Sequence, residues 1–237
     1  NVKYLRPKKN LGFGRANNFA FKLVKTKYTL LINSDIKTSL EDIVNLVKMM
    51  IKFPKTGITV PILTDEKKVN NDNIEVLPEI SAKFLNKNLR KRNFKNNLLQ
   101  GDTCIYFCWG AIMLLNNEII KKTKLFNKKY FLYWEDYDLC RKLYFNKIPI
   151  IKVFNSRAHH MKHKSVKKNI HNQFIMDFYH VYSSYLYFDL KKNNKILIQR
   201  LIIYFFRTLS YMLILNLKGI IKNIARFAAI IKYKFLN

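Results

Sequence analysis

The chain has 237 residues, of which 49% are hydrophobic, enough for the core of one ordinary domain and a further segment. Its 44 Lys and Arg residues against 15 Asp and Glu give a formal net charge of +29. The lysines are scattered, and no helix-turn-helix, zinc-finger or RNA-binding aromatic motif accompanies them, so we expect no specific nucleic acid partner. An anionic lipid surface or a sugar diphosphate suits this charge better. Three cysteines without paired spacing argue against a disulfide framework and against a zinc site.

Strands and helices alternate through the first part of the chain. A helix is predicted over residues 12–24, after a glycine turn, and a short strand over residues 28–33. The segment Thr38-Ser39-Leu40-Glu41 matches a helix capping box, and apolar residues follow it at helical spacing as far as Ile51. The next strand is predicted from residue 58 to residue 60. This alternation indicates an α/β sheet that binds ligands at the carboxyl ends of its strands.

The middle of the chain is less regular. Residues 64–100 contain many Asn and Lys and few apolar positions, which is typical either of an acceptor-facing loop or of a solvated surface excursion. Residues 103–115 are apolar apart from Trp109-Gly110-Ala111, which predicts a strand with a small-residue bend where substrate can approach the backbone. A helix is then predicted over residues 135–146 and a strand over residues 148–154.

The final part of the chain is expected to be helical and of another character. Residues 196–217 are strongly apolar but contain Arg200 and Arg207, and each arginine would cost roughly 3 kcal/mol at the centre of a bilayer. The arginines fall on one side of the helix and Leu, Ile and Phe on the other, which favours a helix lying in a membrane interface. A helix packed on the rest of the protein is the alternative. Gly219 is expected to break the segment before a second basic and apolar helix over residues 220–235.

Three carboxylates lie within four positions in the segment Tyr133-Trp134-Glu135-Asp136-Tyr137-Asp138, and Arg141 follows. Neighbouring carboxylates disfavour each other's ionised form, so one of them is expected to have the raised proton affinity that a general base needs. The alternative is a helix start with acids at its positive end and an Asp138–Arg141 pair one turn along. The pattern alone leaves both interpretations open.

Four other segments accompany these acids in a fixed order. They are Asn10-Leu11-Gly12-Phe13-Gly14-Arg15-Ala16-Asn17-Asn18, Asn33-Ser34-Asp35, Gly110-Ala111, and a histidine cluster followed by Ser165. Together the five segments resemble the family 2 glycosyltransferases, in particular the rhamnosyltransferase-like branch that builds bacterial surface polysaccharides. The resemblance implies an α/β fold of the GT-A type, with a Rossmann-like sheet, over residues 1–168. Residues 169–237 are then a helical, membrane-associating region. The family pattern begins further upstream, so the resemblance also implies that the first nucleotide-binding strands are missing from this chain.

The implied activity is transfer of a sugar from a nucleoside-diphosphate donor, a dTDP- or UDP-sugar, to a hydroxyl of a lipid-linked or polysaccharide acceptor. Asp136 is the implied general base, which predicts inversion at the anomeric carbon. Glu135 would orient the acceptor or raise the proton affinity of Asp136. The implied location is the cytoplasmic face of the plasma membrane, as a peripheral protein. The alternative from another class is a non-catalytic basic module that binds anionic membrane or nucleic acid.

The resemblance further implies a divalent ion, Mn²⁺ or Mg²⁺, held by Asp35 and His160. Carboxylate oxygen suits a hard cation and imidazole is compatible with Mn²⁺. His159 and His163 are close competitors, because three histidines lie within five positions. The residues expected to contact donor or acceptor are Asn10, Gly12, Arg15, Asn18, Asn33, Gly110 and Trp134. Turn geometry is the simpler account of Gly12.

Overall fold

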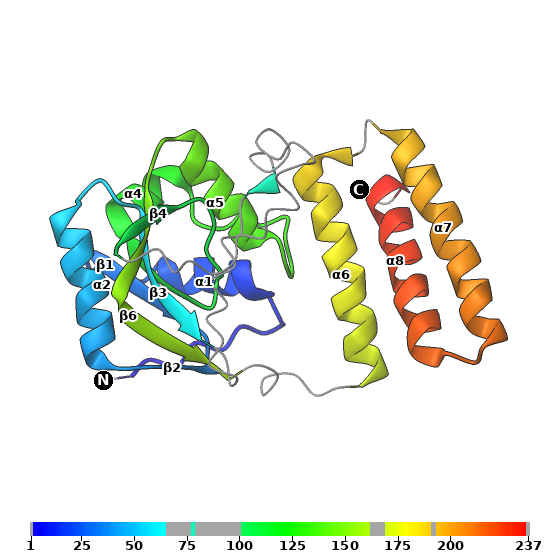
Figure 1. Cartoon of the computed structure of the whole chain (residues 1–237), viewed down its shortest axis with the longest axis horizontal. Coiled ribbons are helices and arrows are strands. Elements are labelled where there is room, and N and C mark those ends of the chain that lie inside the picture. The colour runs from blue at the N-terminus through cyan, green and yellow to red at the C-terminus, as the bar shows by residue number, and fades with distance from the viewer. Residues whose placement is uncertain (1, 65–76, 79–100, 162–168, 191–192, 236–237) are drawn as a thin grey trace. The chain divides into compact units, whose positions relative to one another are not determined.

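The computed structural model describes residues 2–64, 77–78, 101–161, 169–190 and 193–235 (Figure 1). The chain forms two compact units. The sheet unit comprises residues 18–126 and 136–165, and the helical unit comprises residues 1–17, 127–135 and 166–237. Most of the polar segment predicted over residues 64–100 lies outside the described residues, as do His163 and Ser165.

A mixed sheet of six strands organises the described part of the sheet unit. Its strand order is β1 (Tyr28–Ile32), β5 (Ile112–Asn116), β3 (Ile58–Thr64), β6 (Ile150–His160) and β2 (Ile36–Thr38), and β4 (Thr103–Ile105) also pairs with β6. β3 and β6 run parallel, and the other pairs are antiparallel. The α/β fold class predicted from the sequence is confirmed, with a sheet that is mixed rather than wholly parallel.

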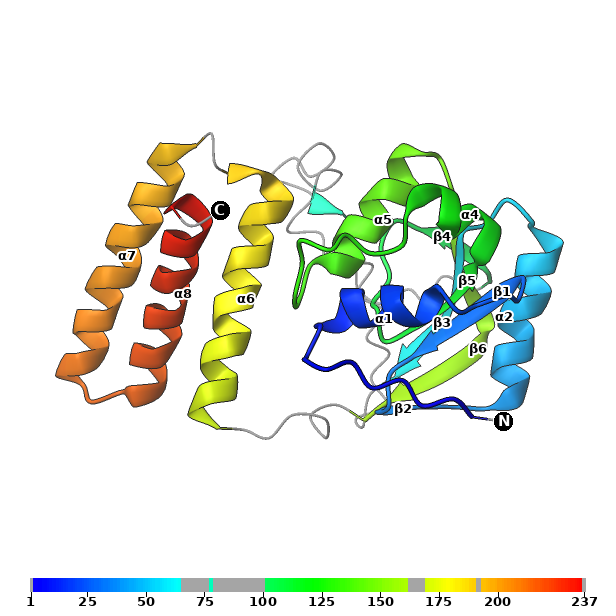
Figure 2. The same ribbon diagram turned by 180° about the vertical axis from the view of Figure 1, so that it is seen from behind.

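Helices cover this sheet, as Figures 1 and 2 show from opposite sides. They are α1 (Phe13–Phe21), which spans both units, α2 (Leu40–Lys52), α4 (Asn117–Thr123) and α5 (Glu135–Phe145). The apolar face of α2 packs on β5 and β6 through Leu46, Met49, Met50, Leu114, Ile151 and Val153. The helix begins one residue later than the capping box predicted, because Ser39 is the N-cap and Asp42 is the reciprocal partner.

β6 is longer than predicted and continues through a polar run to His160. The side chain of Ser156 donates to the Asp42 carbonyl at 2.9 Å, and the Arg157 N–H donates to the Asp42 carboxylate at 2.7 Å. The pairing register with β3 shifts between Pro61 and Ile62, so β6 makes an irregular step beside a residue that has no N–H. The polar run that favoured a strand end at residue 154 is therefore hydrogen-bonded to Asp42, in the first turn of α2.

Three long helices form most of the described helical unit: α6 (Ile170–Phe188), α7 (Asn194–Leu213) and α8 (Leu217–Phe235). α8 packs against both of the others and lies between them (Figures 1 and 2). Their common core consists of Val181, Tyr182, Tyr185, Leu197, Tyr204, Ala229, Ile230 and Tyr233.

Gly219 does not break the helical segment as predicted. The break lies at residues 214–216, where Leu215 has a φ of 51°, and Gly219 is buried inside α8. A Cβ at Gly219 would lie 2.6 Å from the ring of Tyr211 on α7. Glycine is needed here because it lets the two helices approach closely beside their connection, not because it ends a helix.

Candidate active site

Two of the sequence motifs are neighbours at the carboxyl end of β1. Ile32, the last residue of β1, pairs with Ile112 at the start of β5. One position further along, the Asn33 N–H donates to the Ala111 carbonyl at 2.9 Å. The turn that contains Asn33 therefore lies beside the buried Gly110 and Ala111, at the sheet edge where α/β folds usually bind ligands.

Asp35 and His160 meet at the same edge. Asp35 Oδ2 lies 3.4 Å from His160 Nε2, and β2 pairs Ile36 with His160. The Met161 N–H donates to the Asp35 carbonyl at 2.9 Å, which fixes the chain after β6 against the turn after β1. Asp35 is buried and His160 is partly exposed.

These two side chains fit one divalent ion. Neighbouring ligands around an octahedral ion with bonds of about 2.1 Å are separated by about 3 Å, close to the spacing of the Asp35 and His160 atoms. Within the ranges that the structure describes, no group of three or more His, Cys, Asp and Glu side chains could surround a metal. An ion bound by only two protein groups keeps positions open for phosphate oxygens, which is the usual arrangement for Mg²⁺ at phosphate sites.

His159 points to a different partner. Its Nδ1 lies 3.4 Å from the hydroxyl of Thr64 on the neighbouring strand β3. Successive side chains of a strand lie on opposite faces, so His159 and His160 do not share a face. Among the described histidines of the cluster, His160 is the one beside Asp35.

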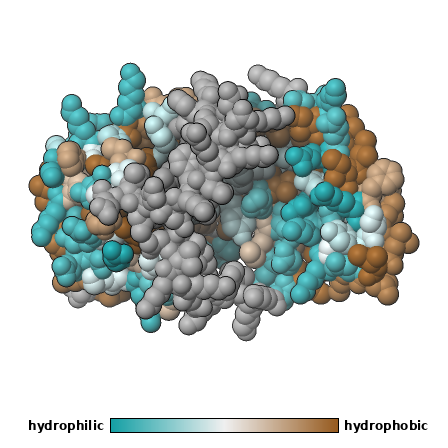
Figure 3. All heavy atoms as spheres, in the orientation of Figure 1, coloured by the Kyte–Doolittle hydropathy of each residue, from teal (hydrophilic) through white to brown (hydrophobic). Residues whose placement is uncertain are grey.

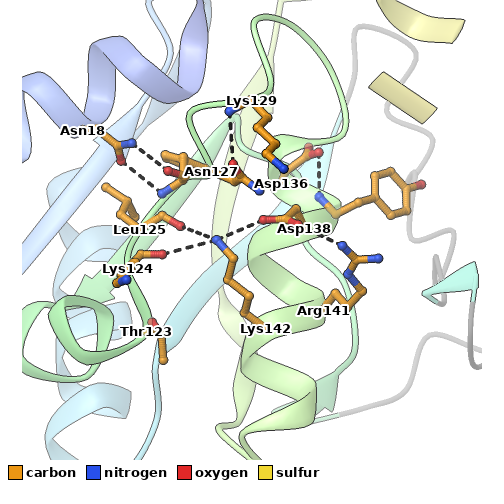
Figure 4. Close-up of polar contacts among 12 residues, drawn as sticks. Asn18, Thr123, Lys124, Leu125, Asn127, Lys129, Asp136, Asp138, Arg141 and Lys142 are labelled. Carbon is orange, nitrogen blue, oxygen red and sulfur yellow. Dashed lines mark hydrogen bonds and ion pairs between the residues drawn. The ribbon is translucent and has the colours of Figure 1, made fainter. Parts of the chain in front are cut away.

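Asp136, in the first turn of α5, faces the Gly110 backbone. Its Oδ2 accepts the Gly110 N–H at 3.4 Å. Its Oδ1 accepts the N–H of the next residue, Tyr137, at 2.9 Å (Figure 4). The residue after Gly110 accepts the hydrogen bond from Asn33. Short backbone contacts therefore connect Asp136, through Gly110 and Ala111, to the turn that carries Asp35.

Asp138 has a different environment from Asp136. It is buried, and its two carboxylate oxygens pair with Arg141 at 3.0 Å and with Lys142 at 2.9 Å (Figure 4). Lys142 also lies 3.4 Å from the carbonyls of Lys124 and Leu125. The alternative given for the acid cluster, an Asp138–Arg141 pair one turn along the helix, is therefore correct for Asp138, and Lys142 of the same helix adds a second cation.

Trp134 and Tyr133 form a bend ahead of α5 with left-handed backbone angles, φ 69° and φ 65°. The Trp134 ring packs 5.1 Å from Tyr187 and 5.4 Å from Phe188, centroid to centroid, on α6. Burial, with the charges of Asp177 and Glu135, raises the pKa of the Tyr133 hydroxyl. Glu135, the first residue of α5, is buried. Core packing within the helical unit therefore accounts for both aromatic residues, and a substrate role for Trp134 or Glu135 stays a prediction.

An aromatic cluster beside Gly110 was missed by the sequence reasoning. Phe107 stacks on Tyr137 with ring centroids 4.0 Å apart, and Trp109 meets both rings edge-on. Trp109 is 46% exposed although it precedes the buried Gly110. An exposed indole next to the backbone that holds Asp136 is a suitable platform for the apolar face of a sugar. The only sequence signal for it was its place directly before the Gly-Ala motif.

Cys108 and Cys140 are buried thiols, with their sulfur atoms 3.8 Å apart. The hydrogen bond with Cys140, burial and the nearby negative charges raise the pKa of the Cys108 thiol. A protonated, buried thiol is a poor nucleophile and a poor metal ligand. The cysteines therefore have a packing role.

The first motif is held together by hydrogen bonds to the backbone. Gly12 has a φ of 74°, its N–H donates to Asn10 Oδ1 at 2.9 Å, and a Cβ at this position would lie 1.9 Å from the Phe131 carbonyl oxygen. Arg15 Nε donates to the Lys128 carbonyl at 2.7 Å. Asn18, in the sheet unit, donates to the Phe126 carbonyl at 2.7 Å and accepts the Phe126 N–H at 3.0 Å. Turn geometry and close approach account for Gly12, and donor contacts from these residues remain predictions.

The sequence is similar to known transferases. Residues 1–123, more than half of the chain, match the family described as Glycosyl transferase family 2. The rhamnosyltransferase WbbL of Escherichia coli (strain K12) is 29% identical over 143 residues, which cover 56% of this chain and 54% of the relative, so the chain spans about half the length of that protein. A solved structure described as GalNAc-T7 with UDP, GalNAc and Mn²⁺ superposes with a TM-score of 0.48 and 15% identity, over 66% of this chain and 32% of the other. From the family match, the chain belongs to glycosyl transferase family 2.

Proposed function

We propose that the protein transfers a sugar, a deoxyhexose such as rhamnose by similarity to WbbL, from a dTDP- or UDP-linked donor to a lipid-linked or polysaccharide acceptor in the synthesis of bacterial surface polysaccharide. The observation that carries this proposal is the placement of Asp136 beside Gly110. Asp136 accepts the Gly110 N–H, and the neighbouring Ala111 carbonyl accepts a hydrogen bond from Asn33, in the turn that carries Asp35.

Asp136 is the proposed general base. Its carboxylate takes the proton of the acceptor hydroxyl while that oxygen forms a bond to the anomeric carbon. The bond from the anomeric carbon to the diphosphate breaks on the opposite side, so the configuration inverts. The Gly110 N–H orients the carboxylate, and the exposed Trp109 ring supports the sugar that approaches it.

Asp35 and His160 are the proposed ligands of Mn²⁺ or Mg²⁺. A bound divalent ion supplies positive charge that stabilises the departing diphosphate. The carboxylate and imidazole contribute one hard and one borderline donor, a pair that accepts either metal. Asn33 and Gly110 line the same sheet edge, where we propose that the donor lies.

The membrane surface is the proposed partner of the helical unit. We propose that the protein is peripheral and lies on the cytoplasmic face of the plasma membrane, where a lipid-linked acceptor would be presented. Support comes from the basic and apolar character of the C-terminal helices.

The test is a donor screen with product analysis. Purified protein is incubated with single nucleoside-diphosphate sugars, an acceptor extract and Mn²⁺, and release of nucleoside diphosphate is measured. We expect release with a restricted set of donors, loss of release with chelator, and an inverted anomeric configuration by NMR. Asp136→Asn should bind donor without turnover, whereas Glu118→Gln, a charge change at an exposed ion pair on α4, should match the wild type. A retained configuration, or full turnover by Asp136→Asn, would reject the mechanism.

A further inference from the structure

We infer that the hairpin of α7 and α8 inserts into a single leaflet of an anionic phospholipid bilayer, through the outward face of α7 and the turn at residues 213–217. The inference deepens the proposed membrane association by assigning the inserted residues and the depth. It concerns lipid binding alone, so it stands or fails separately from sugar transfer.

α7 has the length and composition of a membrane helix but is not buried like a core helix. In the part of the chain that the structure describes, it is the one helix long and apolar enough to cross a bilayer, and 11% of its most apolar stretch is buried. The core helix of a soluble protein of this composition would be mostly buried. In Figure 3, apolar side chains gather along the edge that α7 occupies in Figure 1.

The outward face of α7 is continuous. Leu197 and Tyr204 point into the core of the helical unit, and the side chains on the face away from them remain exposed. These exposed residues are Ile198, Ile202, Phe205, Phe206, Leu209 and Leu213. At ~100° per residue, Arg200 lies about 160° around the helix from Ile198, and Arg207 lies equally far from Leu209. The apolar face can therefore enter lipid while both arginines stay in water or among headgroups.

The turn between the helices is more exposed still. Leu213 and Leu215 are 86% and 89% exposed, and Ile214 and Leu217 are each more than half exposed. The single polar residue of the turn, Asn216, is engaged, because its side chain accepts the Gly219 N–H at 2.9 Å. An apolar tip of this kind at the end of a helical hairpin marks an interaction surface rather than a surface adapted to water.

Charge identifies the partner. Residues 193–237 contain eight Lys and Arg residues and no Asp or Glu. They are Lys195, Arg200, Arg207, Lys218, Lys222, Arg226, Lys232 and Lys234. Arg226 lies 4.0 Å from Asp177 on α6, which leaves seven of these cations without an ion pair given by the described residues. Two copies of this hairpin would repel each other, and a neutral bilayer would offer these cations no counter-charge, whereas an anionic bilayer offers both an apolar interior and negative headgroups.

The packing of α7 argues against a spanning helix. Crossing the bilayer would separate Leu197 and Tyr204 from α8 and would bring Arg200 and Arg207 into hydrocarbon. Insertion of the outward face and the tip leaves the core of the helical unit unchanged. The hairpin is therefore suited to one leaflet.

The experiment uses the whole protein and vesicles of phosphatidylcholine with or without phosphatidylglycerol. We expect sedimentation with the anionic vesicles only. Leu213→Asp with Leu215→Asp should reduce the bound fraction about tenfold or more, because two inserted side chains become charged. The matched control is Leu40→Asp with Ile51→Asp, which makes the same change at two exposed apolar positions of α2 and should alter binding less than about twofold.

Further measurements distinguish insertion into one leaflet from a spanning helix, from binding by charge alone and from contact with a second copy of the chain. Leu215→Trp should show quenching by brominated lipid, and alkaline carbonate should release the protein from the vesicles; retention after carbonate would overturn the one-leaflet assignment. If the Leu213 and Leu215 double variant bound vesicles as well as the Leu40 and Ile51 double variant, binding would depend on charge alone. That result would reject the assignment of Leu213 and Leu215 as inserted residues. The protein could instead form a dimer without vesicles, and the Leu213 and Leu215 changes could dissociate it. That result would assign the apolar surface to contact with a second copy of the chain and reject the lipid assignment. Asp136→Asn should bind vesicles like the wild type, so loss of transfer and loss of lipid binding remain distinguishable.

Discussion

Replacing each of two neighbouring acids by its amide should have opposite consequences. Asp138→Asn removes a buried charge that faces Arg141 and Lys142, whose side chains are 26% and 27% exposed. Removing one partner of a fully buried pair costs about 3–5 kcal/mol. Water reaches both cations here, so we expect a loss of about 1–3 kcal/mol in the free energy of unfolding. A protein of ordinary stability, about 5–15 kcal/mol, still folds after this loss.

Asp136→Asn should leave stability nearly unchanged and remove activity. The contacts of the carboxylate include a hydrogen bond of 2.9 Å from Tyr137 and one of 3.4 Å from Gly110, and the amide oxygen of Asn can retain one of these two. We expect a change within about 1 kcal/mol. An amide cannot accept the proton of the acceptor hydroxyl, so kcat should fall by about 10² to 10⁴.

The two quantities are measured on the same samples, by urea denaturation and by initial rates of nucleoside diphosphate release at a temperature where both variants are folded. Asp138→Asn should keep its kcat within about tenfold of the wild type, since the ion pairs of Asp138 with described residues are with Arg141 and Lys142 on its own helix. The reasoning is refuted if Asp138→Asn loses as much turnover as Asp136→Asn while its free energy of unfolding is unchanged.

Three further predictions follow from the site. His160→Ala should weaken Mn²⁺-dependent donor binding in calorimetry by roughly tenfold or more, whereas His159→Ala should not, and equal effects would remove the assignment of His160. Trp109→Ala should raise the acceptor KM several-fold with little change in donor binding, and an unchanged KM would show that no sugar stacks there. At pH 8, maleimide should label the exposed Cys104 and spare Cys108, because the raised pKa of Cys108 keeps its thiol protonated and the thiolate is the reacting form. Labelling of Cys108 should increase as the pH rises or urea is added, and rapid labelling of both at pH 8 in mass spectra would contradict the burial.

Local patterns predicted the elements whose signals are local. The strand predicted at 28–33 is β1, and the helix predicted at 135–146 is α5 within one residue at its end. The predicted strand ended too early, before the polar run Asn155, Ser156 and Arg157, which belongs to β6. The partners of this run lie more than one hundred positions away, because Asp42 accepts hydrogen bonds from Ser156 and Arg157 and the Asn45 side chain donates to the Asn155 carbonyl. No window of sequence contains that information.

In the candidate site, too, some features have a local sequence signal and others depend on distant parts of the chain. Strand alternation placed the turn with Asp35 at a carboxyl end, and the structure brings Gly110 and His160 to that edge. Which of His159 and His160 lies beside Asp35 follows from the register of β6 with β2, which only pairing can set. The sequence already offered Asp136 as the base and an Asp138–Arg141 pair at the i,i+3 spacing, and the structure adds the second ion pair of Asp138, with Lys142 at i,i+4, and the hydrogen bond from Gly110 to Asp136.

The bend before α5 points to a role for the helical unit beyond the proposed lipid binding. Two successive left-handed residues other than glycine cost about 1–2 kcal/mol each, so such a bend persists only where packing over-determines it. Here the packing comes from α6: Tyr133 lies 5.7 Å from the His180 ring, and Trp134 lies against Tyr187 and Phe188. Ser183 adds a 2.8 Å hydrogen bond to the Leu132 carbonyl.

This bend leads covalently into Glu135 and Asp136, so the conformation that starts α5 depends on contacts made after residue 168. The boundary predicted between residues 168 and 169 separates two kinds of sequence, and as a functional division it remains a prediction. Packing assigns residues 127–135 to the same unit as the C-terminal helices. If the contacts of α6 with this bend were lost, the bend would relax. The relaxation would shift the start of α5 and misplace the carboxylate of the proposed base, Asp136. We therefore propose that the C-terminal helices support the backbone that leads into Asp136, in addition to carrying the proposed lipid-binding surface.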